Sequence, residues 1–483
     1  MNRLSEKTEV TLTGCSPTPL AHYLKALGVL RLVNGQLDAN VRGKWRSDDF
    51  VLQGEMTEQE LVEFLLHEYE PSPIAAPWNG GAGIKAGNTK DEWQTILNGS
   101  AQRFEPLRSV VESSLELMDT LGISGKVPSS RKEEFLNACR SRWPDKGLEW
   151  LDAALVLTGN GPKYPPILGT GGNDGRLDFS INFATRLQDL FDPNNGSPRP
   201  MAPDWLHSSL FGTNDTHLSS DGAIGQFFPM AAGGPNQGAG FGTGTLLNPW
   251  DFVLMLEGAV MFAAATVKRL ETVGSGAMSA PFCVRHVGVG HGSADPSEQE
   301  DARPEMWLPV WERPASAKEL HALMAEGRAE VDGRPARDGL DFARAVAGLG
   351  VDRGIASFQR FGFQQRNGRA YFATPLNRVK VKRRPQVDLL GEIDDWLDRF
   401  LSRAYSDNAP NAVQSAARNL ERRLFALSVH GGANRLADVI IALGDCERTM
   451  ARSLEWSREN FVNPLSGLST RWVKQADDGT AEF

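Results

Sequence analysis

The chain has 483 residues, of which 41% are hydrophobic and 23% are charged, and its formal net charge is -9. This length allows two or three domains with ample core material, so disulfide staples are unnecessary. The net negative charge argues against indiscriminate coating of nucleic acid, but it leaves room for a local basic site. The four cysteines are far apart and form no CxxC pair, which predicts reduced thiols in a cytoplasmic protein.

Residues 1–158 are predicted to form an N-terminal α+β domain. Thr57 and Glu60 have the spacing of a capping box that begins a helix. The other expected elements are a strand at 10–13, a helix that starts at Pro19 and ends before Gly35, two strands within 41–53, and helices near 101–119, 130–142 and 148–157.

Residues 159–386 are predicted to form a loop-rich α+β region. We expect no regular structure in 159–175 and mostly loop in 192–247, because Gly and Pro are frequent in the first segment and the second ends in a glycine-rich run. Loops this long are unusual in a compact domain unless they are functional or are ordered by a partner. The expected helices are one at 177–191, one opened by Asn248 and Pro249, one capped by Ser316 with Glu319, and one at 338–349.

The helix opened by Asn248 is the most apolar helix candidate of the chain. Its apolar run, 251–267, is too short to cross a bilayer and contains Glu257. We therefore expect a buried helix and no membrane partner.

Residues 387–483 are predicted to form a C-terminal helical bundle, with amphipathic helices at about 387–405, 411–429 and 433–457. The predicted fold class is therefore α+β: a mixed, multi-domain chain with long Gly/Pro-rich loops, a basic β-hairpin region and this bundle.

The basic hairpin region is the strongest local bias in the chain. Residues 353–384 contain nine basic side chains and no acid, whereas roughly four acids would be expected in a window of this length. Asn367-Gly368 predicts a two-residue hairpin turn. The period of a strand would place Arg378, Lys380 and Lys382 on one face, opposite Val379 and Val381.

A strand-spaced row of cations can follow a sugar–phosphate backbone. The alternative interpretation is a solvated edge strand protected by its charge. The candidate nucleic-acid-binding residues are Arg360, Arg366, Arg369, Arg378, Lys380, Lys382, Arg383 and Arg384.

A second set of candidate contacts surrounds a tryptophan in a glycine-rich segment, APWNGGAGIK. An exposed Trp78 could stack on a base, and Lys85 could reach a phosphate. The alternative is that Trp78 is a buried anchor of the loop. The candidate residues for a base contact are Trp78, Asn79, Lys85 and Asn173.

Motifs for enzyme chemistry are weak. The segment 238–244, GAGFGTG, does not match the dinucleotide fingerprint. Cys283, His286 and His291 fit no common zinc spacing. We therefore expect no catalytic residue, no metal and no cofactor, and we retain a nucleotide- or metal-dependent hydrolase as the alternative.

Several segments together resemble the large subunit of type I-G (formerly I-U) CRISPR-Cas effector complexes, also called Cascade. They are GCSPTPLAHYLKALGVLRLV at Gly14, APWNGGAGI at Ala76, WLDAALVL at Trp150, PPILGTGGNDGRLDFSINF at Pro165, NPWDFVLMLEGA at Asn248 and SAPFCVRHVGVG at Ser279. The resemblance covers most of the chain, and the combination is specific although each glycine motif alone is weak.

The resemblance implies a non-catalytic subunit of a crRNA-guided surveillance complex in antiviral defence. Such subunits contact the flanking motif beside the target, help to open the duplex and recruit the helicase–nuclease, while guide pairing reads the sequence. The implied partners are crRNA, double-stranded target DNA, the helicase–nuclease, and the backbone, crRNA-processing and small subunits. Trp78, Asn79, Lys85 and Asn173 would then be candidates for the flanking-motif contact. A scaffold that only bridges other proteins is a further alternative.

Overall fold

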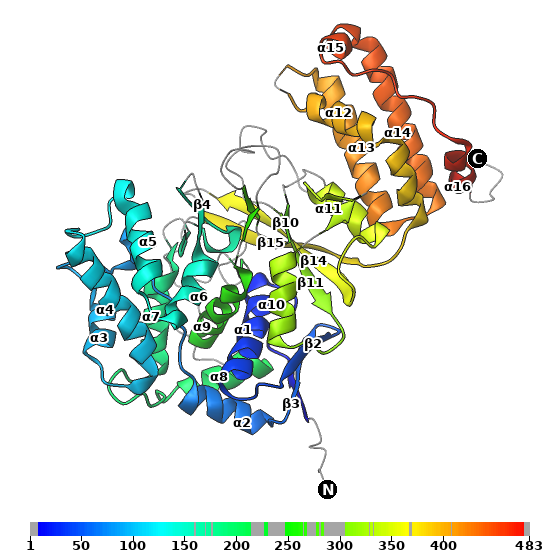
Figure 1. Cartoon of the computed structure of the whole chain (residues 1–483). Helices are drawn as coiled ribbons and strands as arrows, with labels where there is room; N and C mark the ends of the chain where they lie inside the picture. The colour runs from blue at the N-terminus through cyan, green and yellow to red at the C-terminus, as the bar shows by residue number, and fades with distance from the viewer. Residues whose placement is uncertain are drawn as a thin grey trace. The chain divides into compact units, whose positions relative to one another are not determined.

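The computed structural model describes the residues 8–158, 161–169, 171–174, 177–213, 227–229, 247–263, 265–267, 277–279, 282–284, 305–327, 329–331, 333–366, 370–406 and 408–477. The fold is α+β, as predicted, with several small sheets and a C-terminal helical bundle (Figure 1). The chain divides into two compact units. The first comprises 1–283, 310–327 and 361–376, and the second comprises 284–309, 328–360 and 377–483.

The first unit contains a three-stranded sheet in the order β1-β3-β2, from β1 (Thr8–Leu12), β2 (Arg42–Arg46) and β3 (Asp49–Gly54). All pairs are antiparallel, and Leu52 of β3 lies opposite Val10 of β1. Trp45 packs against Tyr23 and Phe50 beneath this sheet. The strands predicted at 10–13 and within 41–53 are therefore present.

Helices α1 (Leu20–Gln36) and α9 (Pro249–Ala259) form the centre of the first unit, and they lie side by side in Figure 1. Their backbones touch at two glycines. A Cβ on Gly28 would lie 2.0 Å from the carbonyl oxygen of Leu254, and a Cβ on Gly258 would lie 1.8 Å from that of Leu24. No side chain fits at either position, so glycine is required there by close approach.

Two buried ion pairs flank the glycine contact. The fully buried Glu257 accepts hydrogen bonds from Tyr69 (2.7 Å) and Arg31 (2.8 Å). The buried Lys25 donates to Asp251 (2.7 Å), which also accepts from the Ser209 hydroxyl (2.6 Å). Each buried charge thus has an opposite charge and further hydrogen bonds, which is the condition for tolerating it in a core. The prediction of a buried helix opened by Asn248 is confirmed, because the Asn248 side chain accepts from the backbone N–H of Trp250.

The remaining first-unit elements surround this helix pair. They are α2 (Glu58–Glu63), the π-helix η1 (Phe64–Glu68), α3 (Asp91–Asn98), α4 (Glu105–Thr120), α5 (Lys132–Arg142), α6 (Asp145–Ala154), α7 (Phe179–Leu190), α8 (Ala202–Phe211), α10 (Ala317–Glu326), and the strand pairs β4 (Val156–Thr158) with β5 (Gly161–Lys163), β6 (Asn173–Asp174) with β7 (Leu177–Asp178), and β8 (Ala265–Val267) with β9 (Ala277–Ser279). Short 3-10 turns are η2 (Gly80–Ala82), η3 (Gln102–Phe104), η4 (Ser129–Arg131), η5 (Pro166–Leu168) and η6 (Val260–Phe262).

Both segments predicted to lack regular structure contain some. β5, η5 and β6 lie within 159–175, so that prediction is wrong. α8 falls within 192–247 and buries Leu206 and Leu210. Helices of ten residues are marginal on their own, and α8 packs against α9, a partner that its own sequence does not reveal.

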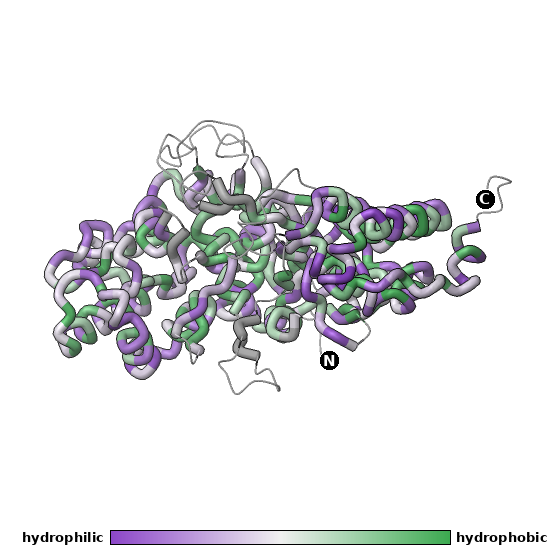
Figure 2. The backbone as a smooth tube through the Cα atoms, turned by 90° about the horizontal axis from the view of Figure 1, so that it is seen from above, coloured by the Kyte–Doolittle hydropathy of each residue, from purple (hydrophilic) through white to green (hydrophobic). Residues whose placement is uncertain are grey.

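The second unit is mainly helical. Its elements are β12 (Glu330–Val331), β13 (Arg334–Pro335), α11 (Gly339–Gly348), the 3-10 segment η8 (Pro385–Ile393), α12 (Asp394–Ala404), α13 (Asn411–His430), α14 (Ala433–Arg452), α15 (Leu454–Glu459) and α16 (Thr470–Ala476). α13 packs against α14 and α11. The predicted C-terminal bundle is present, and the helices near the C mark of Figure 2 alternate hydrophobic and hydrophilic residues along the chain.

A four-stranded sheet has the order β10-β11-β14-β15, from β10 (Cys283–Val284), β11 (Glu305–Trp311), β14 (Ile355–Arg366) and β15 (Ala370–Lys380). Each of these strands contributes residues to both units. The domain boundaries predicted after 158 and after 386 are not those of the structure. The first boundary fails because α1 and α9, which are far apart in the sequence, share one core.

Across the described residues, no helix is both long enough and apolar enough to cross a membrane.

Candidate nucleic-acid interface

The predicted hairpin consists of β14 and β15, which are neighbours in the four-stranded sheet. The tip, 367–369, lies outside the described residues, so the predicted Asn367-Gly368 turn and Arg369 stay predictions. Arg366 ends β14, but its side chain is also outside the described part of the structure.

The predicted alternation is present at the end of β15. Val379 is fully buried, whereas Arg378, Lys380 and Lys382 are exposed. The strand ends at Lys380, but the backbone N–H of Val381 still donates to Ala356 (2.9 Å), so the pairing extends one residue further. We call Arg378, Lys380 and Lys382 the basic edge.

The basic edge differs from residue to residue in what its side chains contact. Arg378 donates to the Gln359 side chain (3.3 Å). Neither Lys380 nor Lys382 has a carboxylate partner among the residues that the structure describes. A cation without a nearby acid keeps its full attraction for an incoming phosphate.

Arg360 is not part of this surface, and its prediction as a phosphate contact is wrong. Its side chain is 4% exposed. Its guanidinium donates to the fully buried Glu305 (2.6 Å) and lies over the rings of Trp307 (4.9 Å) and Phe425 (4.4 Å). Arg360 therefore holds β14 to β11 and to α13 within the second unit.

Arg384 does not extend the exposed row as predicted, because the chain has left the strand before it. Its side chain is largely buried and donates to the carbonyl oxygens of Lys382 (2.8 Å) and Lys380 (3.3 Å). Burial lowers the pKa of its guanidinium. Arg383 is exposed but pairs with Asp388 (2.5 Å). Both arginines shape the end of the strand rather than present a free charge.

Three further basic residues belong to the second unit. Arg353 is exposed just before β14. His430 and Arg435 lie where α13 ends and α14 begins, and Arg384 packs against Gly431 between them. The pKa of His430 is lowered by burial and then by the charges of Arg435 and Arg384. His430 and Arg435 could not be predicted to lie beside Arg384, because they are outside the acid-free stretch and come from separate elements.

The structure contradicts Trp78 and Asn79 as direct base contacts. Trp78 is 1% exposed and its indole N–H donates to the carbonyl oxygen of Gly171 (2.8 Å). Asn79 is buried and donates to the same oxygen (3.1 Å). The alternative interpretation, a buried loop anchor, is the correct one. Lys85 is half-buried, and the Asn173 side chain lies outside the described residues.

Most residues of the alternative hydrolase hypothesis lie outside the part of the chain that the structure describes. The segment 238–244, His286 and His291 lie outside the described residues. Cys283 is in β10, and burial raises the pKa of its thiol. Among the described residues, no group of three or more His, Cys, Asp or Glu side chains is placed to hold a metal ion.

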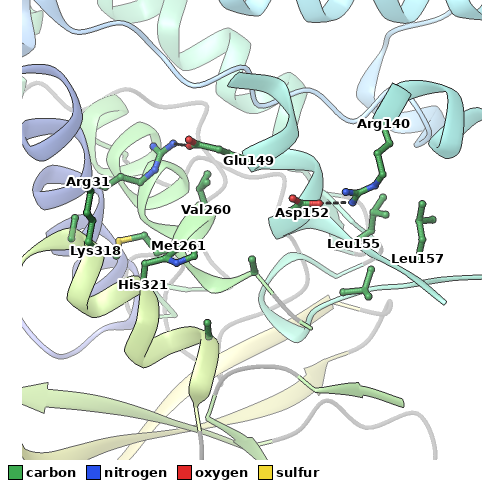
Figure 3. A pocket seen from close by; sticks show the side chains of 14 residues that line it. Arg31, Arg140, Glu149, Asp152, Leu155, Leu157, Val260, Met261, Lys318 and His321 are labelled. Atoms are coloured by element: carbon green, nitrogen blue, oxygen red, sulfur yellow. Dashed lines mark hydrogen bonds and ion pairs between the residues drawn. The ribbon is translucent and has the colours of Figure 1, made fainter. Parts of the chain in front are cut away.

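A pocket of about 560 Å³ opens in the first unit between α6, α10 and η6. Figure 3 shows its two ion pairs, Arg31 with Glu149 and Arg140 with Asp152. Its wall is mainly aliphatic, and Lys318 and His321 of α10 border it. The volume is that of a small-molecule site, but the arginines and acids on its rim already satisfy one another.

Comparison with known proteins adds no relative. No family model matches the chain, and no curated protein matches it.

Proposed function

We propose that this chain is the non-catalytic large subunit of a crRNA-guided type I CRISPR surveillance complex, acting in the cytoplasm. In this role it contacts target DNA near the flanking motif, aids duplex opening and recruits the helicase–nuclease. The proposal rests on the resemblance of the six sequence segments and on one structural observation, the basic edge.

The basic edge supports the proposal because Lys380 and Lys382 lie close together in the sequence and have no carboxylate partner among the residues that the structure describes. Lys380 and Lys382 extend from the last residues of an edge strand into a chain whose overall charge is negative. In such a chain a local cationic row attracts phosphate without binding nucleic acid over the whole surface. Arg353 and Arg435 enlarge the cationic surface of the same unit.

The first experiment is to co-express the chain with the expected backbone and crRNA-processing subunits and a guide RNA, and to purify it by a tag on the chain. The proposal expects a complex that contains the other subunits and a short RNA. Recovery of the chain alone, with all partners expressed, would contradict it.

The second experiment tests the basic edge within that complex. Lys380→Glu with Lys382→Glu should weaken binding of target duplex DNA about tenfold or more and flatten its salt dependence. The matched control is Lys146→Glu with Lys318→Glu, two exposed lysines of the first unit. If both double variants bind like the unmodified complex, the basic edge has no phosphate role, and a purely protein-bridging scaffold becomes the better hypothesis.

An enzyme would behave differently in the same preparations. A metal-dependent hydrolase predicts stoichiometric metal in the purified chain, which elemental mass spectrometry detects. A nucleotide-dependent hydrolase predicts turnover of nucleoside triphosphate by the chain alone.

A further inference from the structure

Three buried tryptophans hold the segment 75–83 of the first unit in place. The indole N–H of Trp78 donates to Gly171 (2.8 Å), that of Trp93 donates to Ala82 (2.7 Å) and that of Trp150 donates to Ala75 (2.8 Å). All three rings are among the most completely buried side chains of the protein. Three buried indoles hold this loop in one conformation before any ligand binds. The loop therefore loses little conformational entropy when a ligand binds to its exposed side.

The exposed side of this loop consists of two glycines, which have no side chains. Gly80 and Gly81 are exposed, although Trp78 and Asn79 before them and Ala82 after them are buried. Gly83 ends the turn with φ of +78°, a conformation that favours glycine. Without side chains, the chain at Gly80 and Gly81 can be approached closely by a ligand.

Three lysines from different elements converge on this turn, which we call the glycine turn (residues 79–83). A Cβ on Gly80 would lie 3.2 Å from Cδ of Lys126, and a Cβ on Gly83 would lie 2.7 Å from Cδ of Lys90. Nζ of Lys132 lies 3.3 Å from the Asn79 side-chain oxygen. Five residues span at most about 17 Å even when extended, so the three side chains border one small surface.

The three lysines have no acidic partner in the described part of the chain. Among the described residues, none of Lys90, Lys126 and Lys132 forms an ion pair. Lys132 is half-buried, and burial lowers its pKa, so its ammonium would gain from an anionic partner. The buried carboxylate of Asp178 caps α7. Burial raises the pKa of Asp178 to about 6, while hydrogen bonds from Ser180 and Ile181 and the charge of Lys90 act in the opposite direction.

We propose that the glycine turn and the ammonium groups of Lys90, Lys126 and Lys132 bind neighbouring backbone phosphates of nucleic acid, one for each ammonium group, forming a second contact separate from the basic edge. Ammonium groups bind phosphate as point charges, and exposed glycines let the backbone of the ligand come close. The choice of nucleic acid as the ligand rests on the proposed function. The contact itself rests only on the arrangement of the turn.

The test uses the full-length chain and a fluorescein-labelled 20-base-pair DNA duplex, with binding followed by anisotropy from 50 to 200 mM salt. A parallel series uses single-stranded RNA of the same length, which tells which strand type the turn prefers. The variant Lys90→Ala with Lys126→Ala and Lys132→Ala should bind the preferred probe about tenfold more weakly at 50 mM salt. The slope of log affinity against log salt should shrink by about 2 to 3, one unit for each lost phosphate contact.

The matched control removes the same charge from the same unit. Lys146, Arg313 and Lys318 are exposed, and none of them lies on the segments that carry the three lysines of the turn, so their triple alanine variant should bind like the unmodified chain. A triple Lys→Arg variant of the glycine turn should retain most of the affinity because the charge is kept. Thermal melting checks folding. If the alanine change at half-buried Lys132 lowers the melting temperature, the exposed pair Lys90→Ala with Lys126→Ala is used instead, with an expected slope change of about 2.

The outcomes separate this inference from the proposed function. Equal loss of affinity in the turn variant and the control variant would overturn the inference, as would an unchanged slope in the turn variant. If the turn variant binds normally while Lys380→Glu with Lys382→Glu binds weakly, the proposed function stands and the second contact falls. If the turn variant loses affinity but the chain assembles with no guide RNA or partner, the phosphate contact stands and the subunit assignment falls.

Discussion

Arg360 and Lys380 lie on neighbouring strands of one sheet and within one acid-free stretch of sequence, yet they have opposite roles. Arg360 is on β14, which has a strand on each side, and is buried against Glu305 and two aromatic rings. Lys380 is on the edge strand β15 and is exposed. The comparison shows that a cation's place in the sheet, rather than the local density of charge, decides whether it stabilises the fold or faces a ligand.

The largest effect should come from removing Arg360. Arg360→Ala leaves Glu305 charged and buried without its partner, which should lower the free energy of unfolding by about 3–5 kcal/mol. Urea unfolding followed by circular dichroism measures this. Lys380→Ala should leave the urea concentration at the midpoint of unfolding unchanged, because Lys380 is exposed. Equal midpoints for the two variants would break the comparison.

Glu421, a buried acid of the second unit, should change the free energy of unfolding by a comparable amount, in a way that depends on pH. Glu421 of α13 accepts a hydrogen bond from the Tyr405 hydroxyl, and burial raises its pKa to about 7. The unfolded chain, with an ordinary Glu pKa near 4.5, loses this proton more readily. Stability contributed by the protonated form is therefore complete below about pH 4.5 and is lost as the pH rises to about 7, by up to about 3 kcal/mol.

Glu421→Gln tests this by removing the charge. The variant should melt at a higher temperature than the unmodified chain at pH 8 and at nearly the same temperature at pH 5. Calorimetry at both pH values gives the comparison, and the surface variant Glu455→Gln on α15 provides a control with no change. A pH-independent difference would mean that shape, rather than ionisation, explains the result.

Arg384 is an intermediate case that sharpens the comparison. Its guanidinium closes the end of β15 by two hydrogen bonds to backbone oxygens. Arg384→Ala should cost about 1–3 kcal/mol in stability, while its effect on DNA affinity should be smaller than that of Lys382→Ala. A variant that folds normally but loses DNA affinity would place Arg384 in the interface after all.

The smallest effect on stability, and a clear effect on binding, is expected at the edge. Lys380→Ala with Lys382→Ala should leave the melting temperature unchanged and should reduce the salt slope of duplex binding by about 2. Fluorescence anisotropy at several salt concentrations gives the slope. A slope that stays constant would favour the solvated-edge interpretation of these lysines.

Features set by local chemistry were predictable from the sequence. The capping boxes of Thr57 with Glu60 and of Ser316 with Glu319 are both present, because a cap depends on residues three apart. The alternation around Val379 is also local, because successive side chains of a strand point to opposite faces of the sheet. Helices are present at all three positions predicted for the C-terminal bundle, although the first is a 3-10 segment followed by α12 and the last is divided into α14 and α15. α11 begins at Gly339, and Asp338, the first residue of the predicted helix, is its N-cap.

Features set by distant contacts were not predictable. The burial of Arg360 depends on Glu305, 55 positions earlier, and that of Trp78 depends on Gly171, 93 positions later. The sequence shows a cation among cations and a tryptophan among glycines, and neither pattern reveals the partner. The lysines of the glycine turn were missed because Lys90, Lys126 and Lys132 come from separate segments that only the fold brings together.

The glycine contact between α1 and α9 also bears on how the protein is made. About 210 residues separate the two helices, and synthesis at roughly 5–20 residues per second leaves α1 without its partner for roughly 10–40 s. During that interval the apolar surface of α1 that α9 later covers stays open to other chains. Fragments that stop before Pro249 should therefore aggregate. Expression of the whole chain in soluble form should improve when a chaperone that shields this helix is present during translation.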